Sequence, residues 1–281
     1  MYKPRLLIAD FRFHYIFMLP HKQFPNNLSN LPNIKDILYA RSIQGMLAPT
    51  EEDLKKMFPC LSVYDKPRGY LSGDFLFARQ KKDIVFLAVC DCTGHGMSAA
   101  LMTVLAREKF SHAFNKAVGP AHLLTRLDER FRMSILRGDK DRLMSVGMGM
   151  DLAVLAYDKC LQTIRFAGAR RPMWIVRNGN LMEFKGTARS IGGNYWKNDV
   201  FIETTVPVRT GDMVYIFTDG LSDQFGGAKD KKLMRSGLRK LVISASELDV
   251  ADQTAYISSQ MRGWQSDRDS TDDQMLAVFK V

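Results

Sequence analysis

The chain has 281 residues, of which 46% are hydrophobic and 25% are charged, and its formal net charge is +10. This composition is typical of a folded globular protein and excludes a disordered chain. No apolar run approaches the ~20 residues of a membrane-spanning helix, and the N-terminus lacks the small-residue cleavage site of a signal peptide. We therefore expect a cytoplasmic protein without a membrane span.

The positive charge does not indicate a nucleic-acid-binding surface. Basic residues are scattered along the chain, and the densest group is Lys229, Lys231, Lys232 and Arg235. This group has no interleaved aromatic residues on which bases could stack. A solvated basic surface is the better interpretation, and we expect no nucleic-acid partner.

The first part of the chain divides into two segments. Residues 1–32 show no clear period and form an N-terminal extension that ends in a turn-rich stretch. Residues 33–48 carry apolar side chains at helical spacing, namely Ile34, Ile37, Leu38, Ile43, Met46 and Leu47. This predicted helix either packs on the domain that follows or acts as a linker or switch helix that joins two copies of the chain in a homodimer.

Residues 49–281 form the main domain, in which strands and helices alternate in blocks. A predicted hairpin over residues 70–91 precedes helices over 97–117 and 121–136. Further strands follow between 146 and 219, and the dipeptide Asn178-Gly179 predicts a two-residue hairpin turn among them. A helical segment over 231–262 and a last strand over 274–281 complete the chain. This order predicts an α+β fold, in which two stacked antiparallel β-sheets are flanked by helices.

Acidic residues recur at the edges of apolar segments in this domain. Asp74 stands beside a glycine in a predicted strand, Asp91 and Asp219 end strands that run into Gly-containing turns, and Asp272 and Asp273 begin the last strand. A buried carboxylate needs a partner, and basic residues are sparse directly beside these positions. Carboxylate and carbonyl oxygens are the ligands that Mg²⁺ and Mn²⁺ prefer, so the pattern indicates a shared metal site.

Cys90 and Cys92 flank Asp91, but they do not form a typical zinc site. A C-x-C pair without a second pair nearby is a weak metal motif. Their position in an apolar strand predicts small core residues instead of nucleophiles, because a reactive thiol needs an electropositive setting.

Six motifs together resemble the SpoIIE-like branch of the metal-dependent protein phosphatase (protein phosphatase 2C) superfamily. The resemblance covers about residues 33–281, and the motifs read, in order, KPRGYLSGDF, DCTGHGMSAALM, FAGARRPMWIV, RSIGG, FTDGLSDQFGG and TDDQM. The resemblance implies an α-β-β-α sandwich with two Mn²⁺ or Mg²⁺ ions at one end. It implies metal contacts from Asp74, Asp91, the Cys92 backbone carbonyl and Asp219, and from Asp272 or its neighbour Asp273, between which the sequence does not decide.

The resemblance also implies the reaction. Two hard cations lower the pKa of a water molecule, which then attacks the phosphorus of a phosphoserine. His95 is a candidate general acid or a turn residue, and Arg170, Arg171 and Arg189 are candidate phosphate contacts or surface residues. The expected substrate is a phosphorylated STAS-type anti-sigma-factor antagonist of a partner-switching pathway. The alternative is a catalytically degenerate member that serves as a binding module.

Overall fold

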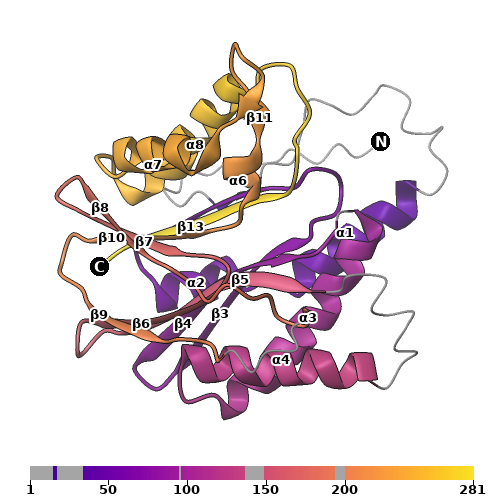
Figure 1. The fold of residues 1–281 in the computed structure, drawn as a ribbon, viewed down its shortest axis with the longest axis vertical. Coiled ribbons are helices and arrows are strands. Elements are labelled where there is room, and N and C mark those ends of the chain that lie inside the picture. Colours follow the sequence, from indigo (N-terminus) through magenta and orange to yellow (C-terminus); the bar gives the residue numbers. More distant parts are fainter. Residues whose placement is uncertain (1–14, 18–33, 95, 137–148, 194–199) are drawn as a thin grey trace, which may run out of the picture.

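The computed structural model describes residues 15–17, 34–94, 96–136, 149–193 and 200–281. In these parts of the chain, two β-sheets stack face to face, and a pair of helices covers the outer face of each sheet (Figure 1). The predicted fold class, two stacked antiparallel sheets flanked by helices, is confirmed.

The first sheet has six strands, and its order does not follow the sequence. In spatial order they are β1 (Tyr15–Phe17), β2 (Leu61–Lys66), β13 (Gln274–Lys280), β10 (Met213–Phe217), β7 (Met173–Arg177) and β8 (Asn180–Phe184). All neighbours are antiparallel except β1 and β2, which are parallel. The last strand of the chain therefore lies in the middle of this sheet.

The second sheet has five strands, all antiparallel. In spatial order they are β3 (Asp74–Lys81), β4 (Ile84–Cys92), β5 (Met150–Asp158), β6 (Thr163–Ala169) and β9 (Thr204–Pro207). A separate two-stranded hairpin joins β11 (Phe225–Gly226) to β12 (Lys231–Lys232). The second sheet thus keeps β3, β4, β5 and β6 in sequence order, so consecutive strands lie side by side.

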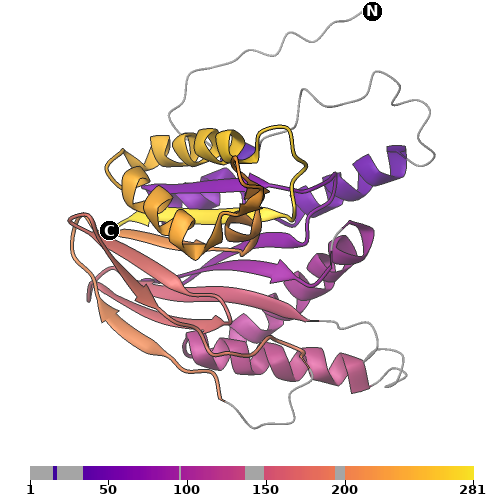
Figure 2. The same ribbon diagram turned by 45° about the horizontal axis from the view of Figure 1, so that its top comes forward.

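The helices separate into two outer layers (Figure 2). One layer, on the second sheet, consists of α3 (Met97–Lys116) and α4 (Pro120–Leu136). The other, on the first sheet, consists of α7 (Met234–Ala245) and α8 (Val250–Gln265). Two short helices complete the domain, α2 (Glu51–Met57) before β2 and α6 (Gly220–Asp223) after β10.

Strand β4 shows why the sequence forms these layers. Its side chains alternate between two cores: Val85, Leu87 and Val89 face the other sheet, while Phe86 and Cys90 face the helix layer of α3 and α4. A strand that is buried on both faces reads as a continuous apolar run, as this one does. The cores hold the strand ends in fixed register at the edge where the acidic residues lie.

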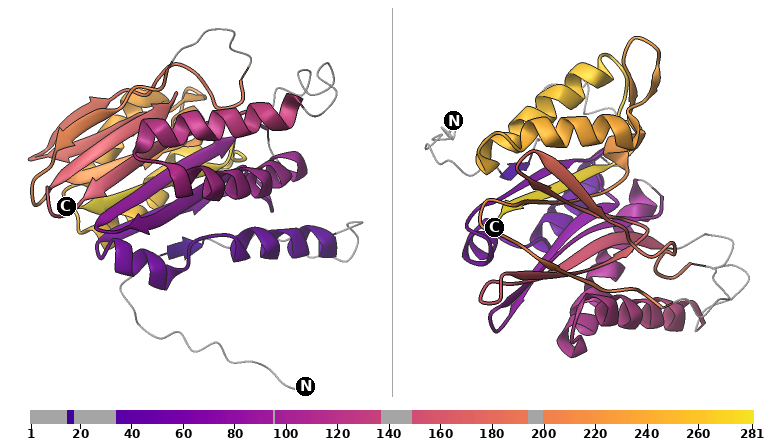
Figure 3. Two further views of the ribbon diagram at one scale, coloured as in Figure 1. Left: turned by 90° about the horizontal axis from the view of Figure 1, so that it is seen from below. Right: turned by 60° about the vertical axis from the view of Figure 1, so that its left-hand side comes forward.

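Helix α1 (Ile34–Met46) lies outside this sandwich, beside α3 (Figure 3). The helix predicted over residues 33–48 is thus confirmed over most of its length. None of its thirteen residues, all of which the structure describes, is buried. The boundaries of the predicted extension, linker helix and catalytic domain stay predictions, and most of residues 1–32 lie outside the described part of the chain. In the described ranges, no helix combines the length and the apolar character needed to cross a bilayer.

Candidate active site

Carboxylates from three neighbouring strands meet at one end of the second sheet. The register places Asp74 of β3 directly opposite Asp91 of β4, and Asp91 directly opposite Asp151 of β5. Side chains directly opposite each other on neighbouring strands interact on one face of the sheet, and like charges in that arrangement repel. The sheet therefore builds a row of negative charge that needs a positive partner.

Two acidic segments of the first sheet come to the same place. Asp219 follows β10 and directly precedes the short helix α6, while Asp272 and Asp273 directly precede the neighbouring strand β13. Gly220 permits their close approach, because a Cβ at this position would lie 1.9 Å from the Asp273 carbonyl oxygen. Only glycine fits there, which explains the glycine that follows Asp219 in the sequence.

One nitrogen atom joins three of these carboxylates. Nη2 of Arg171 lies 2.5 Å from Asp219 Oδ2, 2.9 Å from Asp91 Oδ2 and 3.1 Å from Asp151 Oδ2. The turn between β6 and β7 places the side chain, and in this turn Arg170 adopts a left-handed backbone conformation with φ of +62°. The Arg171 side chain is only 11% exposed, so its charge acts in a largely desolvated setting.

The pKa values show that ionising the carboxylates of this cluster is costly. Burial raises the pKa of Asp91 well above its ordinary value, the Arg171 guanidinium opposes this rise, and Asp219 and Asp151 add to it. Burial also raises the pKa of Asp74, and the charge of Asp91 raises it further. Burial lowers the pKa of Arg171, but the three carboxylates outweigh this effect and keep the guanidinium charged. The site thus carries more negative charge than one arginine compensates, and a further cation would stabilise it.

Asp272 and Asp273 have different surroundings. Oδ1 of Asp273 accepts a hydrogen bond from the Arg68 backbone N–H at 2.6 Å, and Oδ2 accepts one from the Gly73 N–H at 2.7 Å. Asp273 is buried, whereas Asp272 is half-buried and is one of the charges that raise the pKa of Asp91. Asp273 therefore holds the loop before β3 and its charge raises the pKa of Asp74, whereas the charge of Asp272 acts on Asp91.

The backbone of Cys92 lies against the same loop. Its N–H donates to the Gly73 carbonyl at 3.0 Å, and a Cβ on Gly73 would approach the Cys92 carbonyl oxygen to 3.1 Å. The thiols of Cys92 and Cys90 point instead into the core beneath α3 and α4, where burial raises the pKa of both. The prediction that these two cysteines are core residues is confirmed.

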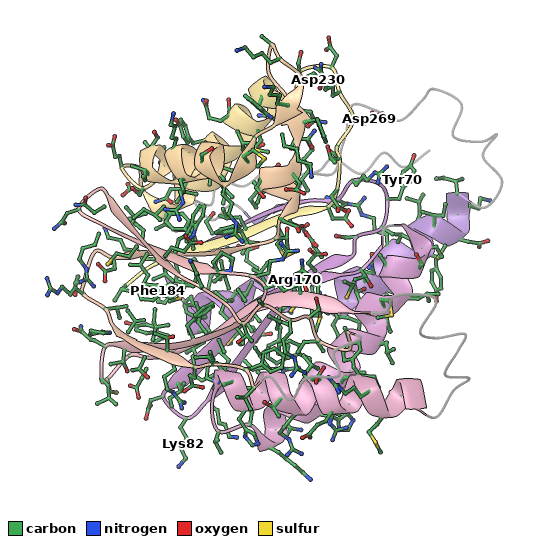
Figure 4. The ribbon with its side chains drawn as sticks, viewed as in Figure 1. Tyr70, Lys82, Arg170, Phe184, Asp230 and Asp269 are labelled. Carbon is green, nitrogen blue, oxygen red and sulfur yellow. The ribbon has the colours of Figure 1, made fainter. Side chains whose placement is uncertain are left out.

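The structure does not bring all the other candidates to the cluster. Arg189 is buried and ion-paired with Asp128 of α4. Arg170 is 54% exposed with its Nε 3.4 Å from Asp151 Oδ2, and Figure 4 shows it near the middle of the molecule beside β5. His95 lies outside the described residues. Arg171 is therefore the candidate arginine that is buried within the cluster.

Asp151 is a residue of the cluster that the sequence-based prediction does not include, although the sequence carries a signal for it. Like the other acidic residues, it stands at the edge of an apolar strand, two residues after a glycine. Its carboxylate accepts a hydrogen bond of 2.5 Å from the Ser190 hydroxyl. Thr218 was also missed; its hydroxyl donates to Asp74 Oδ2 at 2.7 Å. Thr218 has no sequence signal of its own, because its partner is 144 positions away.

The chemistry of this donor set fits a hard divalent cation. Among the residues that the structure describes, no three acidic, histidine or cysteine side chains are spaced to hold a metal ion as they stand. The oxygens of Asp91, Asp151 and Asp219 lie instead at hydrogen-bonding distances from Arg171. Their oxygen donors, burial and unbalanced charge all favour such an ion.

Comparisons with known proteins agree with this arrangement. The family model "Stage II sporulation protein E (SpoIIE)" matches residues 81–281. The SiaA-PP2C domain of Pseudomonas aeruginosa is similar with a TM-score of 0.79 and 25% identity, covering 88% of this chain and 96% of that one. The RsbU and RsbW domains of Rv1364c from Mycobacterium tuberculosis give a TM-score of 0.61 at 17% identity, with 78% and 60% covered.

The description of a third similar structure includes metal ions. The catalytic domain of the serine threonine protein phosphatase PstP in complex with 2 manganese ions gives a TM-score of 0.55 at 14% identity, with 78% and 96% covered. A comparison with curated protein sequences gave no match. At such identities the second and third structures show the shared fold alone.

Proposed function

The chain belongs to the SpoIIE family, whose model matches residues 81–281, and on that premise we propose that it is a metal-dependent protein serine/threonine phosphatase. The observation that carries the proposal is the convergence of Asp91, Asp151 and Asp219 on one positive nitrogen at the end of the two sheets. Such a cluster is stable only around positive charge, and phosphoryl transfer is chemistry for which two cations are well suited.

We assign the metal-holding roles as follows. Asp91 would help to hold both ions, Asp219 and Asp272 would help to hold one, and Asp74 and the Cys92 carbonyl would help to hold the other. Asp272 is preferred over Asp273 because the Asp273 carboxylate already accepts two backbone hydrogen bonds. When bound, Mn²⁺ or Mg²⁺ would supply a strong nucleophile at neutral pH by lowering the pKa of a water molecule.

The chain's own residues would bind and orient the substrate. Arg170 lines a hollow of about 380 Å³ together with Lys185 and Arg235, next to the acidic row. A phosphorylated segment carries negative charge, so these cations favour its approach from this side. Arg171, close to the carboxylates, is the side chain placed to contact a phosphoryl oxygen.

The substrate and setting are part of the same proposal. The SpoIIE resemblance implies phosphoserine on a STAS-type protein of a partner-switching pathway, and one matching structure joins RsbU and RsbW domains. All four cysteines are free thiols, which agrees with a reducing compartment such as the cytoplasm. The exposed apolar side chains of α1 and α3 suit a homodimer.

Asp219→Asn tests the proposal, because it removes one negative charge from the cluster while it keeps the size of the side chain. We expect Mn²⁺-dependent hydrolysis of p-nitrophenyl phosphate and of a phosphorylated STAS domain to fall by more than about 100-fold. This loss is larger than the one usually caused by substituting a residue that only supports a metal ligand. The same loss is expected for Asp91→Asn.

The matched control is Asp83→Asn, which makes the same change on the exposed turn at the opposite end of the β3–β4 hairpin. Its turnover should equal that of the parent protein. Full turnover in Asp219→Asn would refute the assignment. A parent protein that binds the phosphoprotein but does not hydrolyse it with Mn²⁺ or Mg²⁺ would instead identify a binding module.

A further inference from the structure

Arg171 binds two carboxylates that the proposed function assigns to a divalent cation. Its Nη2 contacts Asp91 Oδ2 and Asp219 Oδ2 at 2.9 and 2.5 Å, which places a positive charge directly between them. The same nitrogen lies 3.1 Å from Oδ2 of Asp151, for which the proposed metal set has no role. Arg171 therefore contacts two of the proposed metal-holding carboxylates and one carboxylate outside that set.

The guanidinium is not fully satisfied in this position. Its Nε is buried and has no hydrogen-bond partner among the residues that the structure describes. A buried donor without a partner costs free energy, so this arrangement of Arg171 is less stable than one in which all its N–H groups are bonded. The side chain thus has a reason to move when another cation takes over the charge of Asp91 and Asp219.

The Asp151 carboxylate is held in place by its strand and by a hydrogen bond. It lies within β5, opposite Asp91 in the register, and its Oδ1 accepts a 2.5 Å hydrogen bond from the Ser190 hydroxyl. The segment of Ser190 is itself fixed, because Ile191 and Met150 exchange two backbone hydrogen bonds of 2.9 and 3.0 Å. Asp151 therefore remains available as a counterion whatever happens at the neighbouring carboxylates.

We infer that Arg171 and the divalent cation compete for Asp91 and Asp219, and that Asp151 is a positioning residue that retains Arg171 when the cation binds. The inference rests on the proposed metal set. A single oxygen cannot contact a guanidinium at 2.5 Å and a metal at about 2.1 Å from the same side, because the two cations would overlap and repel. Molecules in which Arg171 contacts Asp91 and Asp219 cannot bind the metal there. The apparent metal affinity is therefore reduced in proportion to the fraction of molecules in which these carboxylates are free of Arg171.

Metal binding measured without any substrate tests the competition. Isothermal titration calorimetry with Mn²⁺ on the full chain would compare the parent protein with Arg171→Met and Arg170→Met. Both variants lose one positive charge beside Asp151, but only Arg171 contacts Asp91 and Asp219. We expect Arg171→Met to bind Mn²⁺ at least about 10-fold more tightly than the parent, and Arg170→Met to change the affinity by less than about 3-fold.

The thermal transition of the metal-free proteins gives a second readout. Arg171→Met leaves three carboxylates without their common cation, so its melting temperature should lie below that of Arg170→Met and should recover more strongly on Mn²⁺ addition. If Arg171→Met fails to fold without metal, Arg171→Lys replaces it, because lysine keeps the charge but its compact ammonium lacks the guanidinium's fork. The expected result is then tighter Mn²⁺ binding than the parent shows.

A double-mutant cycle separates positioning by Asp151 from direct metal binding. Asp151→Asn should weaken Mn²⁺ binding in the parent, because Arg171 then has only Asp91 and Asp219 as partners. In the Arg171→Met background the same change should have little effect. An equal loss of affinity in both backgrounds would show that Asp151 holds the ion itself, and this result would overturn the inference.

Two other results would also overturn it: unchanged or weaker Mn²⁺ binding in Arg171→Met, and no Mn²⁺ binding by any of the proteins. A phosphatase assay on the same samples keeps the inference distinct from the proposed function. A chain that binds Mn²⁺ in the expected order but hydrolyses no phosphoester supports the competition and refutes the phosphatase.

Discussion

At the scale of single residues, Asp65 of β2 is a buried carboxylate to which the proposed chemistry gives no role. It lines a cavity of about 390 Å³ between α1 and the strands, together with Arg41, Arg107 and Asp74. Its Oδ1 is buried and has no hydrogen-bond partner in the described part of the chain. Burial raises the pKa of Asp65 to about 7, the charge of Asp273 adds to the rise, and the two arginines oppose it.

We predict that Asp65→Asn stabilises the protein in a pH-dependent way. Because the folded pKa lies above the unfolded value, ionised Asp65 destabilises the folded state, and this cost grows from about pH 4 to pH 7 and is constant above. The substitution should increase the free energy of unfolding by about 2–4 kcal/mol at pH 8 and by much less at pH 5. Urea unfolding at the two pH values measures the difference.

Asp83→Asn serves as the control for Asp65→Asn, since Asp83 is exposed and its substitution should leave stability unchanged at both pH values. Equal stability of the parent and Asp65→Asn at pH 8 would show that the Asp65 carboxylate is hydrated in solution, against the prediction.

At the scale of elements, the sequence predicted those whose signals are local. Asn178 and Gly179 form the turn between β7 and β8 with positive φ of 50° and 73°, as the dipeptide indicated. The helix predicted over residues 231–262 is wrong in one respect, because β12 begins this segment and α7 and α8 are separate helices. The break has a signal, since Asp249 directly precedes α8, but the apolar spacing runs through it and masked the break.

Helix α2 was missed because it is short. Thr50 caps it by accepting a hydrogen bond of 3.1 Å from the Asp53 N–H, and three acidic residues follow in its first turn. With two buried residues, Leu54 and Met57, it shows little periodicity. Caps of this kind predict a helix only when they are weighed together with the apolar positions that follow.

The side chain of Gln44 connects helix α1 to the segment that precedes Asp74. Gln44 Nε2 donates to the Ser72 carbonyl at 2.8 Å and to the Thr103 hydroxyl at 2.9 Å, and its Oε1 accepts from the Ser72 N–H at 3.3 Å. The Ser72 hydroxyl in turn accepts from the Asp74 N–H at 3.0 Å. The position of α1 is therefore coupled to the backbone of a proposed metal-holding residue.

We predict that Gln44→Leu, which removes the side-chain amide, weakens Mn²⁺ binding by about 10-fold, as expected for the loss of an outer-shell contact. Calorimetric titration with Mn²⁺ measures the change. Ser42→Ala is the matched control on the same helix, because its hydroxyl donates to the Leu38 carbonyl within α1. A loss of stability in Gln44→Leu with unchanged Mn²⁺ affinity would show that α1 is a passive support.

At the scale of the whole molecule, the sequence indicated which carboxylates belong together but not how they are neutralised. The repeated placement of Asp74, Asp91 and Asp219 at the edges of apolar segments predicted a shared site, and the stacked sheets bring them to one end. The position of Arg171 depends on the left-handed turn at Arg170 and on the packing of the two sheets. Such tertiary placement has no local pattern, so the sequence leaves Arg170 and Arg171 as either phosphate contacts or surface residues.

The outside of the molecule carries an apolar face that a single chain leaves in water. Tyr39 and Met46 of α1 are 69% and 75% exposed, and Leu101 on the neighbouring helix α3 is 66% exposed. Exposed apolar side chains on two neighbouring helices are typical of an interaction site. The net charge of +10 opposes association of two identical chains, so any dimer must rely on apolar contact and should tighten as salt screens the repulsion.

We predict that the chain forms a dimer through α1 and α3, with weaker association at low salt than at 0.5 M NaCl. Sedimentation velocity over a range of concentrations measures the dissociation constant. Met46→Asp places two additional charges at the interface, one from each chain, and should weaken the dimer by more than about 10-fold, which corresponds to about 1.4 kcal/mol.

Leu161→Asp makes an equivalent change at a 72% exposed residue on the turn between β5 and β6, and it should leave the dissociation constant unchanged. A monomer at every salt and protein concentration, or an equal effect of the two substitutions, would show that this face serves another partner.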